Sequence, residues 1–290
     1  MRYLDELYGE YTLEGVIPEL IQAELFQRLK SVHQGGGIFL VSPYIDHTRF
    51  EHSIGVMLLI KDLGGSIEAQ IAGLIHDISH TAFSHLIDYV LELEEEDYHE
   101  KRYFELIKDS AISVLLQSHG FDIHTFEKLE AYPLLESPLP NLSADRIDYT
   151  LRDLFQINKV SLAEIQWFKN GLEVFEGRIA VKKREYAEWF QAKYEALSSD
   201  YFESPENKGV HLILKNLLKE ALAKGQIVES DFWEDDYYLM EKLGGEEKLK
   251  QLIKEKGIAQ HQTIRMKARA VDPEIIFDQQ VKRLSDLSTE

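Results

Sequence analysis

The apolar positions of this chain recur mostly at helical spacing. Between residues 17 and 30, five aliphatic side chains fall on one face of an expected helix: Ile17, Leu20, Ile21, Leu25 and Leu29. The glycine run at residues 35–37 should end that helix, and residues 38–46 are expected to form a loop or a hairpin. The pattern therefore indicates helical structure from the first segments onward.

Capping residues mark where the next helix begins. Thr48, with Glu51 three residues later, fits a capping box, so a helix is predicted to start at Arg49. It should end before the glycine pair at residues 64–65.

The rest of the chain adds further helices and a small β region. The expected elements, in order, are a helix capped by Ser66 that carries His76 and Asp77 near its end, a helix from about Ala82, a helix after the glutamate-rich segment 92–96, a helix capped by Asn141 or Ser143, a β-hairpin over 171–183, helices over 188–197 and 211–222, and a strand over 263–271. The hairpin is the expected boundary between a helical core, residues 1–170, and a smaller C-terminal region, residues 171–290. We therefore expect an all-α core with a small β-hairpin and strand appendage.

Composition narrows the range of functions. The 32 basic and 51 acidic residues give a formal charge of −19, which repels long nucleic acids and anionic membrane surfaces. The absence of cysteine excludes disulfides, thiolate metal sites and a cysteine nucleophile. The N-terminus is acidic where a signal peptide is basic, and no apolar run reaches membrane-spanning length, so we expect a cytoplasmic protein.

Candidate chemistry gathers in residues 73–85, GLIHDISHTAFSH. If the helix continued through His76 and His80, which are four residues apart, both imidazoles would lie on one face, a spacing that suits two ligands of one metal. A single histidine of this kind is more often a hydrogen-bonded polar residue at a helix end. The density of the cluster favours a functional site, because six such side chains fall in one supersecondary unit: His52, His76, Asp77, His80, His85 and His99.

Three segments resemble the signature blocks of the HD-domain phosphohydrolases, in the branch that holds deoxynucleoside triphosphate triphosphohydrolases. They are HTRFEHSIGV (47–56), GLIHDISHTAFSH (73–85) and SADRIDYTLRD (143–153). The resemblance implies an all-α HD-domain core, a homo-oligomer, and one divalent metal (Mn, Fe, Co, Ni, Zn or Mg) that activates water against a nucleotide or another small phosphoester. It implies that the metal ligands are His52, His76, Asp77 and Asp145, and it leaves Asp148 as a structural residue.

The resemblance also implies roles around the metal. His99 matches the family's catalytic acid and Asp88 the carboxylate that orients it, while His80 lines the pocket near phosphate or the attacking water. The implied substrate contacts are Arg49, Gln34, His85, Arg146, Tyr149, Asp153 and Lys208. The alternative for Arg49 is a surface ion pair, and the alternative for Tyr149 is a place in the core.

Three departures from the family pattern leave the substrate open. Gly35 stands where an apolar side chain is expected, Arg146 replaces a lysine, and residues 201–212 lack a run of arginine and histidine that helps to hold a triphosphate. The first hypothesis is a dNTP, cleaved to deoxynucleoside and triphosphate. The alternatives are a nucleoside monophosphate, another small phosphoester, or a non-catalytic nucleotide sensor, which the presence of His99 and Asp88 disfavours.

Two further interpretations concern single segments. A two-histidine protease helix would need a glutamate between its histidines; Asp77 is short for that role, and His52 and Asp145 would then have no function. In the expected strand over 263–271, three cations share one face, which either pairs with acidic neighbours or binds phosphate or a partner subunit: Arg265, Lys267 and Arg269.

Overall fold

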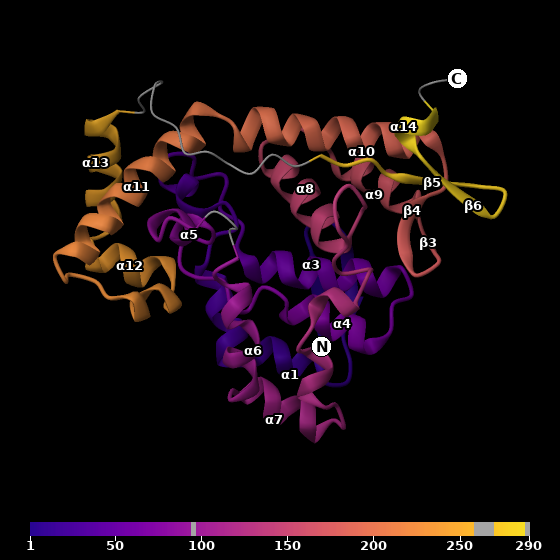
Figure 1. Cartoon of the computed structure of the whole chain (residues 1–290), viewed down its shortest axis with the longest axis horizontal. Helices are drawn as coiled ribbons and strands as arrows, with labels where there is room; N and C mark the ends of the chain where they lie inside the picture. The colour runs from indigo at the N-terminus through magenta and orange to yellow at the C-terminus, as the bar shows by residue number, and fades with distance from the viewer. Residues whose placement is uncertain (94–96, 258–269, 288–290) are drawn as a thin grey trace.

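The computed structural model describes residues 1–93, 97–257 and 270–287, and in it the chain is mainly helical (Figure 1). The helices are α1 (Ile17–Gln22), α2 (Glu24–Gln27), α3 (Arg49–Asp62), α4 (Ile67–Ile75), α5 (Leu86–Val90), α6 (Glu100–Lys108), α7 (Ala111–Ser118), α8 (Ala144–Gln156), α9 (Leu162–Asn170), α10 (Arg184–Leu197), α11 (Pro205–Ala223), α12 (Asp236–Lys242), α13 (Glu246–Lys256) and α14 (Leu284–Leu287). The strands are β1 (Arg2–Asp5), β2 (Gly9–Thr12), β3 (Leu172–Phe175), β4 (Arg178–Val181), β5 (Glu274–Phe277) and β6 (Gln280–Arg283). The predicted fold class is confirmed.

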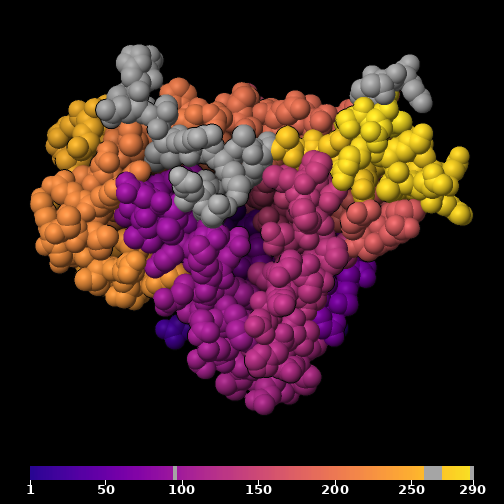
Figure 2. Space-filling model, viewed as in Figure 1, coloured from indigo at the N-terminus to yellow at the C-terminus, as the bar shows by residue number. Residues whose placement is uncertain are grey.

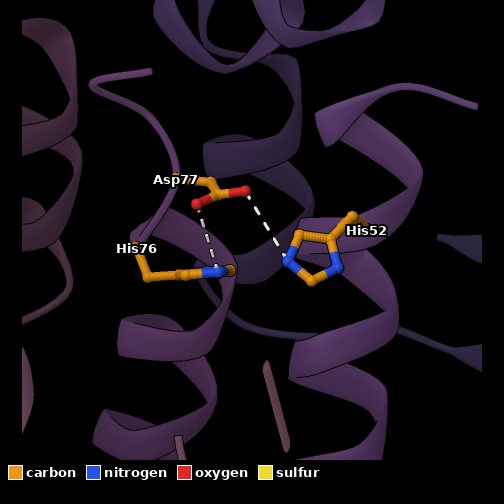
Figure 3. Close-up of side chains that lie close together, drawn as sticks. All are labelled: His52, His76 and Asp77. Carbon is orange, nitrogen blue, oxygen red and sulfur yellow. Dashed lines mark ion pairs between the residues drawn. The ribbon is translucent and has the colours of Figure 1, made fainter. Parts of the chain in front are cut away.

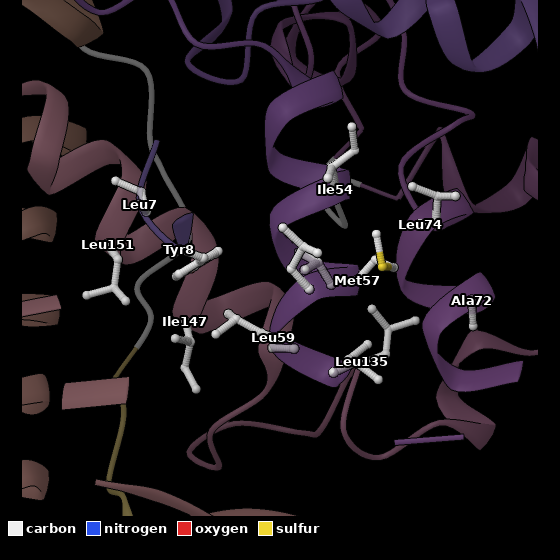
Figure 4. Packing of buried hydrophobic residues seen from close by; sticks show 14 of the residues in the cluster. Leu7, Tyr8, Ile54, Met57, Leu59, Ala72, Leu74, Leu135, Ile147 and Leu151 are labelled. Atoms are coloured by element: carbon white, nitrogen blue, oxygen red, sulfur yellow. The ribbon is translucent and has the colours of Figure 1, made fainter. Parts of the chain in front are cut away.

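Helix α3 forms the centre of the larger hydrophobic core. Eleven of its 14 residues are buried, so neighbours surround it instead of covering a single face. Figure 4 shows Met57 on the side that faces α4 and Leu59 on the side that faces α8. Gly55 permits the close approach of α8, because a Cβ there would collide with the side chains of Asp148 and Arg152. The packing therefore fixes α3, α4 and α8 relative to one another.

The predicted helix starts are confirmed where a local cap specifies them. Thr48 and Glu51 form the capping box of α3, and Ser66 and Ser143 cap α4 and α8 through their side chains. Of the two caps considered for α8, the structure has Ser143.

Two other local predictions are wrong: the single helix over 17–30 and the start of the helix expected near residue 82. The single helix expected over 17–30 breaks at Ala23, whose backbone is extended; Gln27 then donates its side-chain amide to the freed carbonyl of Ile21. Of the loop or hairpin expected over 38–46, the structure has a loop over 41–46, preceded by a buried 3-10 helix at 36–40. Helix α4 ends at Ile75, so His76 and Asp77 lie at its end as expected, and the condition that would place His76 and His80 on one helix face is not met. The next helix starts at Leu86 and not near residue 82.

Two sheets complete the fold. The N-terminal strands β1 and β2 form an antiparallel hairpin that the sequence pattern did not predict. The predicted hairpin over 171–183 is confirmed as β3 and β4, and β4 also pairs in parallel with β5, so the sheet order is β3-β4-β5-β6. Most of the strand expected over 263–271, with Arg265, Lys267 and Arg269, lies outside the described residues.

A second apolar cluster forms where α11, α12 and α13 pack against α5 and the 3-10 helix at 36–40. In Figure 1 these three helices lie at the opposite end of the molecule from the four-stranded sheet. The larger core contains residues from both sides of position 170, and the proposed division there stays a prediction. Among the described residues, no helix is both long and apolar enough to cross a membrane.

Candidate metal centre and active-site cavity

The four predicted metal ligands come from α3, the end of α4 and the first turn of α8. His52 Nε2 lies 3.1 Å from Asp145 Oδ1 and 3.6 Å from Asp77 Oδ2. His76 Nε2 lies 3.4 Å from Asp77 Oδ1 and 3.6 Å from Asp145 Oδ1. Figure 3 shows both imidazoles pointing toward Asp77. Donor atoms of His52, His76 and Asp77 lie within 4.8 Å of one another, and Asp145 Oδ1 faces both imidazoles from the first turn of α8.

Hydrogen bonds on the other ring nitrogens direct both Nε2 atoms toward the carboxylates of Asp77 and Asp145. His76 Nδ1 lies 2.8 Å from Gly73 O, and a carbonyl only accepts, so the proton of the neutral ring is on Nδ1. His76 Nε2 is buried and has no hydrogen-bond partner among the described residues. His52 Nδ1 is held in the same way by Asp148 Oδ2 at 2.8 Å. Two Nε2 atoms facing two carboxylates are, once His52 has lost its proton, a donor set that fits a divalent cation.

A second group of imidazoles lies beside this centre. His80 Nε2 is 3.2 Å from Asp77 Oδ1, and the His80 ring stacks on His99 with centroids 3.7 Å apart. Burial, aided by the Arg49 guanidinium, lowers the pKa of both His80 and His99 well below the usual histidine value. Both rings are therefore neutral at neutral pH when no substrate is bound.

Asp88, the predicted orienter of His99, lies closest to a different histidine. Its Oδ2 is 3.3 Å from His85 Nδ1, and its Oδ1 accepts the N–H of Tyr98 at 3.0 Å. His99 Nδ1 is buried and has no hydrogen-bond partner in the described part of the chain. Since donor atoms of His85, Asp88 and His99 lie within 4.8 Å of one another, these side chains form a second group that could hold a cation.

Both groups open into one cavity of about 630 Å³. Figure 2 shows a recess on one face, between atoms coloured purple and atoms coloured magenta. Six of the seven predicted substrate contacts line the cavity: Gln34, Arg49, His85, Arg146, Tyr149 and Asp153. Lys208 does not belong to the lining, and it forms an ion pair with Glu203.

Most of these side chains already have protein partners. Arg49 is 3% exposed and donates from Nη1 to Asp77 at 2.5 Å, so the alternative of a surface ion pair is wrong. Arg146 donates to the carbonyl of Asn141, while its Nε is buried without a partner among the described residues. Tyr149 shares a hydroxyl contact of 3.1 Å with Tyr194. The cavity is therefore largely preorganised.

Comparison with known proteins identifies the family. The HD domain model matches residues 49–153, the range that contains both groups of histidines. The Bacillus subtilis protein YdhJ is 46% identical over 239 residues, which are 81% of this chain and 73% of that protein. A protein of Cordyceps militaris named metal-dependent phosphohydrolase cns2 is 31% identical over 240 residues, 79% of this chain and 69% of that protein. This chain is an HD-domain metal-dependent phosphohydrolase.

A third relative, a deoxynucleoside triphosphate triphosphohydrolase SAMHD1 homologue of Dictyostelium discoideum, is 24% identical over 255 residues. The aligned residues are 75% of this chain and 48% of the Dictyostelium protein.

Behind His52, a buried ionic network reaches the N-terminal hairpin. Asp148, which holds His52, also accepts from Arg152 Nε at 3.0 Å and from Nη2 at 2.9 Å. Arg152 Nη2 extends to Asp5 at the end of β1 at 3.1 Å, and Asp5 in turn accepts the N–H of Leu7 and the N–H of the residue after it. The hairpin thus supports a metal-facing imidazole from the other end of the network.

Several residues of the cavity wall were not predicted from the sequence. Tyr201, on a π-helical turn at Ser198–Phe202, places a buried hydroxyl in the lining with no hydrogen-bond partner among the described residues. A Cβ at Gly35 would collide with that hydroxyl, and a Cβ at Gly36 would collide with His211. These glycines make room for the side chains of Tyr201 and His211. The glycine run, which we interpreted as a helix stop, was therefore the sequence signal that pointed to this part of the wall.

Loading the site with a metal should release protons. Burial lowers the pKa of His52, but hydrogen bonds to Asp145 and Asp148 outweigh it and raise that pKa to about 10. Below about pH 10 an ion must therefore displace a proton from His52, so affinity for Mn²⁺ should rise with pH through the neutral range. Calorimetric titration with Mn²⁺ in buffers of different ionisation enthalpy measures this release. A pH-independent affinity without proton release would contradict the assignment of His52.

Proposed function

We propose that this HD-domain phosphohydrolase hydrolyses a nucleotide phosphoester at the site formed by His52, His76, Asp77 and Asp145. The main support is that the Nε2 atoms of two imidazoles face the carboxylates of Asp77, which is buried, and Asp145 at one end of a polar cavity. A divalent ion held there would supply Lewis-acid activation of water and of a phosphoryl oxygen.

The chain's own residues would carry the remaining steps. Arg49, fixed by Asp77 and by Ser84 Oγ at 2.8 Å, presents its guanidinium to a phosphate oxygen. His80 lies between Asp77 and His99, where it can accept a proton from an attacking water or contact a phosphate oxygen. His99 would donate a proton to the leaving oxygen.

The low pKa of His99 is compatible with an acid role once substrate is bound. A phosphate dianion in the cavity favours the charged form of a nearby imidazole and raises its pKa. The proton would therefore be held on His99 only in the complex, next to the group that needs it.

The first candidate substrate is a dNTP, cleaved to deoxynucleoside and triphosphate. It is supported by the three signature blocks and by the relatives named as deoxynucleoside triphosphate triphosphohydrolases. In this assignment Gln34, Tyr149 and Asp153 would contact the sugar, and His85 and Arg146 the phosphates.

A nucleoside monophosphate is the second candidate, because the cavity offers few cations. Arg49 and Arg146 are the guanidinium groups of the lining, and Lys208 is outside it. Eight carboxyl side chains also line it: Asp77, Glu100, Glu127, Glu130, Glu136, Asp145, Asp153 and Glu203. Such a wall repels a tetra-anionic triphosphate more strongly than a monoester. Homo-oligomeric assembly, a cytoplasmic location and the absence of long nucleic-acid partners remain part of the proposal.

The deciding experiment is a product assay on Mn²⁺-loaded protein with each dNTP, NTP and dNMP, resolving triphosphate, pyrophosphate and phosphate. Triphosphate from dNTPs supports the first candidate, and phosphate from monophosphates alone supports the second. No product from any nucleotide would overturn the proposal and favour a sensor.

Replacing His99 should separate chemistry from metal binding. In His99→Ala we expect kcat to fall about 10²- to 10⁴-fold, the usual contribution of a general acid, with Mn²⁺ content unchanged. His124→Ala, which changes an exposed histidine, is the matched control and should retain full kcat. A His99→Ala protein with wild-type kcat would rule out the acid role.

A further inference from the structure

A buried carboxylate outside the HD-domain match joins two loops of the cavity wall. Asp236, in the first turn of α12, is fully buried. Its Oδ1 accepts a hydrogen bond from Phe83 N at 2.5 Å. Its Oδ2 accepts one from His33 N at 2.9 Å and lies 2.7 Å from His33 Nδ1. One side chain thus connects segments that are 153 and 203 residues away in sequence.

Both connected segments carry cavity residues. Gln34 and Gly35 directly follow His33, and His80 and His85 lie on either side of Phe83. A shift of either segment would therefore move side chains that face the substrate.

The loop at 78–85 contains a conformation that its neighbours must hold. Phe83 and Ser84 have φ of 56° and 54°, so two successive non-glycine residues lie in the left-handed region. Such a backbone persists only where surrounding contacts over-determine it. Here the Phe83 N–H is held by Asp236, and Ser84 Oγ donates to His33 O at 2.7 Å.

The segment before α12 holds the same loop through one further direct hydrogen bond and, indirectly, through Arg28. Phe232 O accepts the N–H of Ala82 at 2.9 Å. Arg28 donates from Nη2 to Ile78 O at 3.0 Å and to His80 O at 2.6 Å, and from Nη1 to Glu234 O at 2.9 Å. The guanidinium of Arg28 thereby bridges the loop and the segment.

We propose that residues 232–236 clamp the loop at 78–85, and that Asp236 is a positioning residue for His80 and His85. The effect on turnover rests on the proposed function of that site. The proposed ligands His52, His76 and Asp145 are carried by α3, the end of α4 and α8. Loss of the clamp should therefore impair turnover more than metal binding.

The test compares Asp236→Asn with Asp235→Asn, the same change one residue earlier. Asp235 caps α12 by accepting Tyr238 N at 2.9 Å, and asparagine caps a helix about as well as aspartate. An asparagine at 236 keeps one acceptor oxygen, so its NH₂ group must face an N–H of residue 33 or residue 83. Asp235→Asn therefore keeps the cap bond to Tyr238 N, whereas Asp236→Asn loses the bond to the N–H of residue 33 or of residue 83.

In Asp236→Asn we expect amide hydrogen exchange within residues 78–85 to accelerate about tenfold or more, with no change in residues 49–62 and 144–156. Mn²⁺ stoichiometry should stay at the wild-type value. On the substrate found in the product assay, kcat should fall about tenfold while KM changes less than about threefold, because the backbone N–H of Gln34 keeps its bond to His47 O at 3.1 Å. Arg28→Gln should show the same pattern, and it replaces Asp236→Asn as the test if that variant does not fold.

Exchange in residues 78–85 equal to that of Asp235→Asn, or a rise spread evenly over the whole chain, would overturn the clamp. If the wild-type protein hydrolyses no nucleotide, the proposed function fails, and exchange and Mn²⁺ stoichiometry still decide whether the clamp exists.

Discussion

Replacing His76 with alanine is expected to remove both the bound metal and turnover. His76 Nδ1 is bonded to Gly73 O, and its Nε2 faces Asp77 and Asp145, so the substitution deletes a ligand donor together with the edge-on ring contact to His52. A divalent ion stabilises a phosphoryl transition state by several kcal/mol, so kcat should fall by about 10³-fold or more. Metal content by mass spectrometry and kcat on the same preparation test both parts.

His119→Ala is the matched control for this substitution. His119 is exposed at the end of α7 and pairs with Glu19 at 2.9 Å, so its loss should leave metal content and kcat unchanged. Asp77→Ala should behave like His76→Ala. Wild-type metal content in the double variant lacking both side chains would show that the ligand assignment is wrong.

Replacing Arg152 with methionine is expected to give the largest loss of stability. Arg152 is 3% exposed and neutralises Asp148 and Asp5, which are also buried. Removing it leaves Asp5 without a cation and Asp148 with His52 alone, and breaking such a buried pair costs about 3–5 kcal/mol. Urea denaturation of metal-free protein at pH 7 measures the free energy of unfolding.

The control is Arg184→Met, which removes an arginine from an exposed i,i+4 pair with Glu188. Its expected cost is at most about 0.5 kcal/mol, because solvent screens exposed pairs. Arg152→Met should also weaken Mn²⁺ binding by about 10- to 100-fold, since Asp148 would no longer orient His52 as well. Equal stability of the two variants would contradict the role given to this network.

The sequence predicted the elements whose signals are local. The caps at Thr48, Ser66 and Ser143 act over three residues, and the hairpin around Gly177 depends on alternation and a turn, so each can be read without a partner segment. The resemblance of three short blocks likewise pointed to the family and to a set of side chains that the fold brings together.

The tertiary structure decided what depends on distant partners. The two aspartates of the ADRIDY segment could not be distinguished by spacing alone, whereas in the fold Asp145 faces His52 Nε2 and Asp148 holds Nδ1. Intrinsic helix propensity also did not predict the break at Ala23 or the end of α4 before His76, because tertiary context can override propensity.

The sequence by itself determined the helical class, the helix starts and the residues available for metal chemistry, because these follow from residue type and short spacing. Only the tertiary structure decided which carboxylate meets which ring nitrogen, that the N-terminal hairpin supports His52 through Arg152, and that Asp236 reaches Phe83. Those contacts join residues between 93 and 153 positions apart, and a long chain separation carries no periodic signal.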